Sequence, residues 1–195
     1  KWKIFETRIL LILLMLFIVY VPSRIIYDLS VIDLNEINYQ KKLLKPELAD
    51  FKIALISDVQ VDRYTNGDRL NDFIEKVNST EADLILIAGD IITSTPRYIE
   101  TAAETLGKLN AKHGVYACIG DHDNWAYRGN SERSVAEITS ALNKQNIPMI
   151  DNETKIINVN GAEIGITFLT NTYVERISEE LLDSLTNGGY DYDLK

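Results

Sequence analysis

Residues 84–90 read Leu-Ile-Leu-Ile-Ala-Gly-Asp, an unbroken apolar run that ends in a glycine and a carboxylate. Similar apolar runs occupy residues 53–56 and 115–119. Each run is followed by a polar loop and then by apolar residues at helical spacing. Continuous apolar strands that alternate with amphipathic helices are typical of βαβ units. The sequence therefore predicts an α/β domain built on a parallel sheet that is covered on both faces.

The pattern changes after the third predicted βα unit. Residues 153–159 and 162–169 have strand-like patterns and flank an Asn160-Gly161 pair. This arrangement predicts a β-hairpin with a type I′ turn. Residues 178–185 predict a further helix, with Ser178 as its N-cap.

The chain opens with a strongly apolar segment. Residues 9–21 are 13 consecutive apolar residues between Arg8 and the sequence Pro22-Ser23-Arg24. A full membrane span needs roughly 20 residues, but arginine side chains can snorkel and residues 25–27 prolong the stretch. We therefore predict a transmembrane anchor over residues 1–27. The lack of a small-residue cleavage site disfavours a cleaved signal peptide, and the lack of a polar face disfavours a buried core helix.

The basic residues near the start set the predicted orientation of this anchor. Lys1, Lys3 and Arg8 should hold the N-terminus in the cytoplasm. The chain would then be a single-pass protein of the cell membrane, with its domain on the extracytoplasmic side. Residues 28–50 are predicted to form a tether that can add an edge strand, and residues 51–195 the folded domain. Both ends look cut, so we expect this domain to be incomplete at its C-terminus.

The composition excludes several classes of protein. Hydrophobic residues make up 46% and charged residues 25% of the 195 residues, which excludes a disordered or collagen-like chain. The formal charge of −9 argues against binding to a nucleic-acid backbone. A single cysteine, Cys118, rules out an internal disulfide, and two histidines are too few for a histidine-rich zinc site.

Acidic residues follow all three predicted parallel strands. Asp58 follows the first, Asp90 the second, and Asp121 opens the sequence Asp121-His122-Asp123 after the third. Ligand sites of open parallel sheets lie beyond the carboxyl ends of the strands, so these carboxylates should converge. They would repel one another strongly unless a hard cation such as Mg²⁺, Mn²⁺ or Ca²⁺ bound between them. A two-metal site of this kind suits the hydrolysis of a phosphate ester.

These blocks resemble the calcineurin-like metallophosphoesterases, and most of all their bacterial membrane-anchored branch. The family pattern is Asp-x-His, Gly-Asp and Gly-Asn-His-(Asp/Glu), and this chain has Asp58-Val59-Gln60, Gly89-Asp90 and Gly120-Asp121-His122-Asp123. The resemblance implies a four-layer α/β/β/α sandwich, of which this chain holds the first half, preceded by a transmembrane helix. It also implies that the histidine motifs of the family's second half lie beyond residue 195.

The resemblance also implies roles for individual residues. Asp58 would bind the first metal, Asp90 would bridge both metals, and Asp121 would bind the second metal. His122 would steady the developing charge or protonate the leaving oxygen, with Asp123 orienting it. The cofactors would be two divalent ions, which could be Mn, Mg, Ca, Fe or Zn.

Two departures from the family pattern change these expectations. Gln60 stands where the family has a metal-binding histidine, and Asp121 where it has an asparagine. Together they favour Mg²⁺, Mn²⁺ or Ca²⁺ over zinc. They are also compatible with decay of the site, so the rival hypothesis is a degenerate, non-catalytic binding module anchored to the membrane. A nucleotide-binding domain ranks last, because no glycine-rich loop follows the first strand.

The main hypothesis is a metal-dependent phosphoesterase at the membrane surface. Its substrate could be a phosphomonoester or a phosphodiester, and an anchored enzyme suits a lipid-linked or cell-envelope substrate. Trp125 and Arg128 follow the third acidic block and are candidates for substrate contact. The alternative is that Trp125 only shields the metal loops and that Arg128 is only solvated. As it stands, this chain would carry an incomplete active site.

Overall fold

The computed structural model describes residues 2–170, 172–187 and 191–194. The chain divides into two compact units, Lys1–Ile37 and Asn38–Lys195. The first unit is dominated by one long helix and the second contains all the strands.

Helix α1 runs over Trp2–Ser30 and contains Pro22. Within it, Ile4–Asp28 is long and apolar enough to cross a membrane by length and composition, and none of it is buried. A helix of this length spans about 37 Å, more than the roughly 30 Å of a bilayer's hydrocarbon core. At its C-terminal end, Arg24 forms an ion pair of 2.8 Å with Asp28. The helix is thus longer than the predicted anchor.

The segment after α1 differs from the prediction. Residues 28–50 are all described, and they contain no strand. The only regular structure after α1 in this range is the short 3₁₀ helix η1, Pro46–Leu48, whose Leu48 is buried. The expected edge strand is therefore wrong. A strand needs backbone hydrogen bonds to a neighbouring strand, and no described residue of this segment is paired in a sheet.

Three parallel strands form the central sheet: β1 (Ile53–Ile56), β2 (Leu84–Ala88) and β3 (Val115–Cys118). Their order is β1-β2-β3, with Ile56 opposite Ile87 and Ala88 opposite Cys118. The apolar run of residues 84–88 therefore occupies the centre of the sheet. A second, isolated pairing joins Val61 to Ile92 beyond the ends of β1 and β2.

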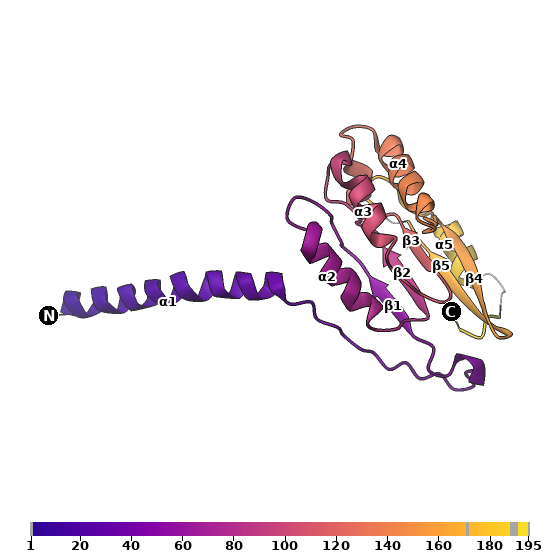
Figure 1. Ribbon diagram of the computed structural model, residues 1–195, viewed down its shortest axis with the longest axis horizontal. Coiled ribbons are helices and arrows are strands. Elements are labelled where there is room, and N and C mark those ends of the chain that lie inside the picture. Colours follow the sequence, from indigo (N-terminus) through magenta and orange to yellow (C-terminus); the bar gives the residue numbers. More distant parts are fainter. Residues whose placement is uncertain (1, 171, 188–190, 195) are drawn as a thin grey trace. The chain divides into compact units, whose positions relative to one another are not determined.

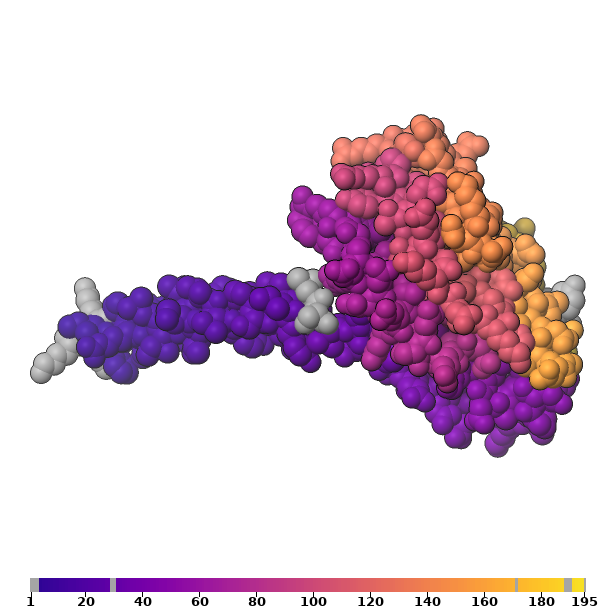
Figure 2. All heavy atoms as spheres, in the orientation of Figure 1, coloured from indigo at the N-terminus to yellow at the C-terminus, as the bar shows by residue number. Residues whose placement is uncertain are grey.

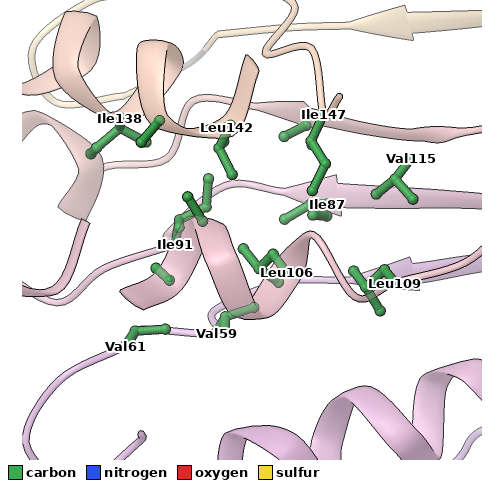
Figure 3. Close-up of a cluster of buried hydrophobic side chains, with 14 of the residues drawn as sticks. Val59, Val61, Ile87, Ile91, Leu106, Leu109, Val115, Ile138, Leu142 and Ile147 are labelled. Atoms are coloured by element: carbon green, nitrogen blue, oxygen red, sulfur yellow. The ribbon is translucent and has the colours of Figure 1, made fainter. Parts of the chain in front are cut away.

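Three helices cover one face of this sheet: α2 (Gly67–Asn78), α3 (Ile99–Leu106) and α4 (Ser131–Lys144) (Figure 1). Their apolar faces share one core with Ile85, Ile87 and Val115 of the strands. Figure 3 shows part of this core, with Leu106 and Leu142 in the same cluster as Ile87. Helices α3 and α4 also pack against each other, as the adjoining atoms in Figure 2 show.

An antiparallel hairpin covers the other face. It consists of β4 (Glu153–Val159) and β5 (Ala162–Phe168), joined by Asn160 and Gly161. Both turn residues have positive φ, 52° and 95°, as a type I′ turn requires. The hairpin packs on Leu84, Leu86 and Tyr116. Both faces are therefore covered, but helices cover only one of them.

The last described helix is α5, Glu179–Asn187. The predicted cap is confirmed, because the Leu181 amide donates to Ser178 Oγ at 3.2 Å. No described residue of α5 is buried. Helices, parallel sheet and hairpin reproduce three layers of the expected α/β/β/α order.

Candidate active site

The loops that follow β1, β2 and β3 are hydrogen-bonded to one another. The Gln60 amide donates to the Asp90 carbonyl at 2.8 Å, which joins the first loop to the second. The His122 amide donates to Asp90 Oδ1 at 2.9 Å, which joins the third loop to the second. The loops carrying all the predicted site residues therefore meet at one edge of the sheet.

Asp123 is the buried centre of this network. Its Oδ2 accepts from the amides of Gly120 (2.9 Å) and Asp90 (3.0 Å). Its Oδ1 accepts from the amides of Ile91 (2.8 Å) and Ile92 (3.4 Å). The residue is 0% exposed. Burial raises the pKa of the Asp123 carboxyl to about 6, although the amide hydrogen bonds oppose this shift.

The expected partnership of Asp123 and His122 is therefore wrong. Both oxygens of Asp123 point to backbone amides, and Nδ1 of His122 lies 2.5 Å from the Thr93 carbonyl oxygen instead. Adjacent residues on a 3₁₀ helix point in different directions, and η3 (His122–Trp125) begins at this pair. Asp123 is thus a structural residue that holds two loops together, and Thr93 orients His122.

The arrangement of the His122 ring follows from its two neighbours. A carbonyl oxygen can only accept a hydrogen bond, so Nδ1 must carry the proton. The other ring nitrogen, Nε2, is then left to exchange a proton with a ligand. Trp125 contacts the ring edge-on, with centroids 5.0 Å apart. Trp125 therefore helps to fix the ring.

Two glycines allow the second and third loops to approach closely. A Cβ on Gly120 would overlap the amide nitrogen and Oδ1 of Asp90. A Cβ on Gly89, whose φ is +74°, would lie 2.5 Å from the Gly120 Cα. Each glycine therefore makes room for the other loop.

Three predicted metal residues have left-handed backbone conformations. Asp58, Gln60 and Asp90 have φ values of 54°, 45° and 54°. Such values are uncommon outside glycine and cost free energy, so the surrounding structure must impose them. At Gln60 and Asp90 the inter-loop hydrogen bonds of their backbone amides do so. Strained residues of this kind cluster at functional sites.

The donor atoms fit a hard divalent cation by their chemistry. The Asp58 side chain is exposed and hydrogen-bonds to no described residue; Gln60 is half-buried, and its side-chain amide likewise has no hydrogen-bond partner among the described residues. Asp90 and Asp121 each use Oδ1 in a hydrogen bond, to the amides of His122 (2.9 Å) and Tyr173 (2.6 Å). Their Oδ2 atoms remain for a ligand. In the described ranges, however, no three Asp, Glu, His or Cys side chains are gathered closely enough to hold a metal ion.

Some residues at this edge were not predicted from the sequence. Thr172, Tyr173 and Arg176 line a pocket of about 300 Å³ together with the predicted residue Asp121. Tyr173 is 52 positions from Asp121, so no local motif connects them. The one available signal is the polar stretch directly after β5. The predicted contact residue Arg128 is exposed and pairs with no described side chain, so substrate contact by it and by Trp125 stays a prediction.

A parallel sheet with aspartates and a histidine on its joined strand-end loops is typical of hydrolases that use hard metal ions. The chain belongs to the calcineurin-like phosphoesterase family, whose family model matches residues 51–191. This match covers the whole sheet, the hairpin and every predicted site residue. The predicted family and fold class are therefore confirmed.

Curated relatives agree with this assignment. A Bos taurus protein named "Transmembrane protein with metallophosphoesterase domain" is 28% identical over 61% of this chain and 26% of its own length. A Caenorhabditis elegans protein named as a metallophosphoesterase is 32% identical over 69% of this chain and 27% of its own length. The Bacillus subtilis metallophosphoesterase YkuE is 31% identical over 49% of this chain and 34% of its own length. The chain thus spans a quarter to a third of the length of these relatives.

Proposed function

We propose that this chain contributes to a membrane-anchored, metal-dependent phosphoesterase with its site at the joined strand-end loops. The observation that carries the proposal is that hydrogen bonds of Asp90 and Asp123 join the three loops, with the Gln60 amide linking the first loop to Asp90. It brings one carboxylate from each parallel strand, and one histidine, to the same edge. Membership of the phosphoesterase family supports the same conclusion.

In this proposal the carboxylates hold two divalent ions of the oxygen-preferring kind. Asp58 and the Gln60 amide oxygen would hold the first ion, Asp121 would hold the second, and Asp90 would contribute to both. Bound ions supply Lewis-acid stabilisation of the charge on the phosphoryl oxygens. Gln60 binds more weakly than a histidine would, which favours Mn²⁺ or Mg²⁺ over Zn²⁺.

The protein groups supply orientation and a proton. Because the Thr93 carbonyl fixes the proton on Nδ1, Nε2 of His122 is the atom that meets the substrate. When the ring is protonated, Nε2–H can donate to the leaving oxygen as general acid. Asp123 acts on this step only through the backbone, by keeping the loops of Asp90 and His122 together.

We expect Asp58→Asn to weaken Mn²⁺ binding at least tenfold, because a neutral amide replaces a free carboxylate. Binding is measured by electron paramagnetic resonance of free Mn²⁺, and turnover with bis(4-nitrophenyl) phosphate in the same samples. Turnover by the 195-residue chain should be slow, since no three metal-binding side chains are gathered in its described part. Asp68→Asn, at an exposed carboxylate in the first turn of α2, is the matched control. Equal affinity of both variants and the wild type for Mn²⁺ would contradict the assignment.

A second candidate function is a non-catalytic module of the same fold. The observation that favours it is the same lack of a gathered three-residue metal group among the described residues. Metal content separates the two candidates. Two ions per chain support the enzyme, and a chain that binds none supports the module.

We further propose that α1 anchors the chain in the cell membrane, with the second unit outside the cytoplasm. The apolar stretch Ile4–Asp28 and the basic residues at its start support this orientation. The name of the bovine relative, a transmembrane protein, agrees with an anchor. A lipid-linked or cell-envelope phosphate ester would then lie within reach of the site.

The orientation can be tested with introduced cysteines and a membrane-impermeant thiol reagent. The native thiol should stay silent at neutral pH, because burial raises the pKa of Cys118 to about 11. In intact cells we expect Glu104→Cys, on an exposed face of α3, to be labelled. Glu6→Cys, at the start of α1, should be labelled only after permeabilisation. The reverse pattern would place the domain in the cytoplasm.

A further inference from the structure

The pocket beside Asp121 is lined by one cationic and one anionic side chain. Asp121 and Arg176 are the charged residues among its lining, and Thr172 and Tyr173 complete it. Arg176 is exposed and forms no ion pair or hydrogen bond with any described residue. Its guanidinium, with five donors, is therefore free to bind an anion.

Asp121 fixes the segment that carries this arginine. Its Oδ1 accepts from the Tyr173 amide at 2.6 Å, which ties the residues after β5 to the loop after β3. Thr172 is 4% exposed, and its hydroxyl oxygen accepts from the amides of Val174 (3.2 Å) and Glu175 (3.0 Å). These bonds make residues 172–175 a compact turn. Arg176 is thus presented from an ordered turn next to the His122 loop.

We propose that this pocket is the subsite for the phosphate group of a phosphomonoester, with Arg176 contacting its terminal oxygens. The inference rests on the proposed function and adds the substrate class to it. Asp121 would contribute to holding a divalent ion, and the Arg176 guanidinium would contact the phosphate that the ion attracts. Arginine binds two phosphate oxygens at once through its planar fork.

The preference for a monoester follows from charge. A phosphomonoester carries about −1.5 to −2 charges at pH 7, because its second pKa is about 6, whereas a diester carries one. The attraction of an unpaired guanidinium grows with the charge of the anion. A monoester also has three terminal oxygens, whereas a diester has two. The monoester therefore keeps more oxygens for Arg176 when other groups of the site contact the phosphate. Arg176 is therefore a specificity-determining residue.

The test compares two substrates in the full chain with Mn²⁺. For Arg176→Gln we expect kcat/KM to fall at least tenfold with 4-nitrophenyl phosphate, mostly through KM, and less than threefold with bis(4-nitrophenyl) phosphate. Arg176→Lys keeps the charge but loses the planar fork. Its kcat/KM with 4-nitrophenyl phosphate should lie between those of the wild type and Arg176→Gln. Arg69→Gln removes an exposed arginine of α2 that pairs with no described residue. It should leave kcat/KM unchanged with both substrates.

A second readout does not depend on turnover. Equilibrium dialysis of inorganic phosphate in the presence of Mn²⁺ should show about tenfold weaker binding to Arg176→Gln. An equal loss with both substrates would mean a structural role, and unchanged phosphate binding would exclude the subsite; either result overturns the proposal. Absence of turnover by a metal-loaded wild type contradicts the proposed function instead. In that case a loss of phosphate binding in Arg176→Gln still supports the subsite.

Discussion

Asp123→Asn is expected to lower the free energy of unfolding by about 3 kcal/mol, because it leaves buried amides without acceptors. The native carboxylate accepts four backbone N–H groups and is 0% exposed. In asparagine, one oxygen becomes an NH₂ group that points at amide donors in either side-chain orientation. The loops after β2 and β3 would then lose their common partner. Urea unfolding of the detergent-solubilised chain, followed by tryptophan fluorescence, measures the change.

The matched control for this prediction is Glu104→Gln. Glu104 is an exposed carboxylate of α3 with no partner among the described residues, so its variant should stay within about 0.5 kcal/mol of the wild type. Because both substitutions remove one negative charge, a general effect of net charge would appear in both. A loss below about 1 kcal/mol for Asp123→Asn would show that the network is not held by this carboxylate.

The elements of the fold could be predicted because their signals are local. Each parallel strand is a short apolar run, and each helix of the domain repeats apolar residues at intervals set by helical geometry. The hairpin turn needs only Asn160 and Gly161, whose positive φ values are a property of the two residues themselves. The convergence of the three strand ends also follows, since parallel strands share one carboxyl edge.

The details of the site could not be predicted, because they depend on contacts between distant residues. Asp123 was expected to orient its neighbour His122, but its partners include the amides of residues 90–92, which belong to another loop. The real partner of His122 is a backbone carbonyl, and a backbone atom leaves no trace in residue type. The tie between Asp121 and Tyr173 has the same origin. A motif therefore locates a site, but it does not say which of its residues bind a ligand and which hold the loops in place.

The anchor and the tether show the same distinction. Composition alone predicts the apolar helix, because thirteen consecutive apolar residues are typical of a segment that lies in a membrane or in a core. The edge strand expected after it did not form, because an alternating apolar pattern does not by itself supply the inter-strand hydrogen bonds that a strand needs. Whether a segment obtains those bonds is a property of the assembled fold.

Gly120→Ala is the second substitution with a large expected effect, and it tests how tightly the loops must approach. Its Cβ would overlap the amide nitrogen and Oδ1 of Asp90, which are held by hydrogen bonds to Asp123 and His122. Neither atom can move without breaking one of these bonds, so we expect a loss of about 3 kcal/mol in the free energy of unfolding. Urea unfolding again measures it, and Mn²⁺ affinity should fall in the same variant as Asp90 is displaced.

Gly107→Ala provides the control, because it adds the same methyl group where a neighbour can yield. A Cβ at Gly107 would meet the side chain of Gln145, with Oε1 at 2.7 Å and Cβ at 3.0 Å; the amide end can rotate away, and Cβ needs to yield by only a few tenths of an ångström. We therefore expect a change within about 1 kcal/mol there. If Gly120→Ala changed the free energy of unfolding equally little, the two loops would be able to move apart without loss of stability. The close approach of Gly89 and Gly120 could then not be what brings Asp90 to the loop of Asp121 and His122.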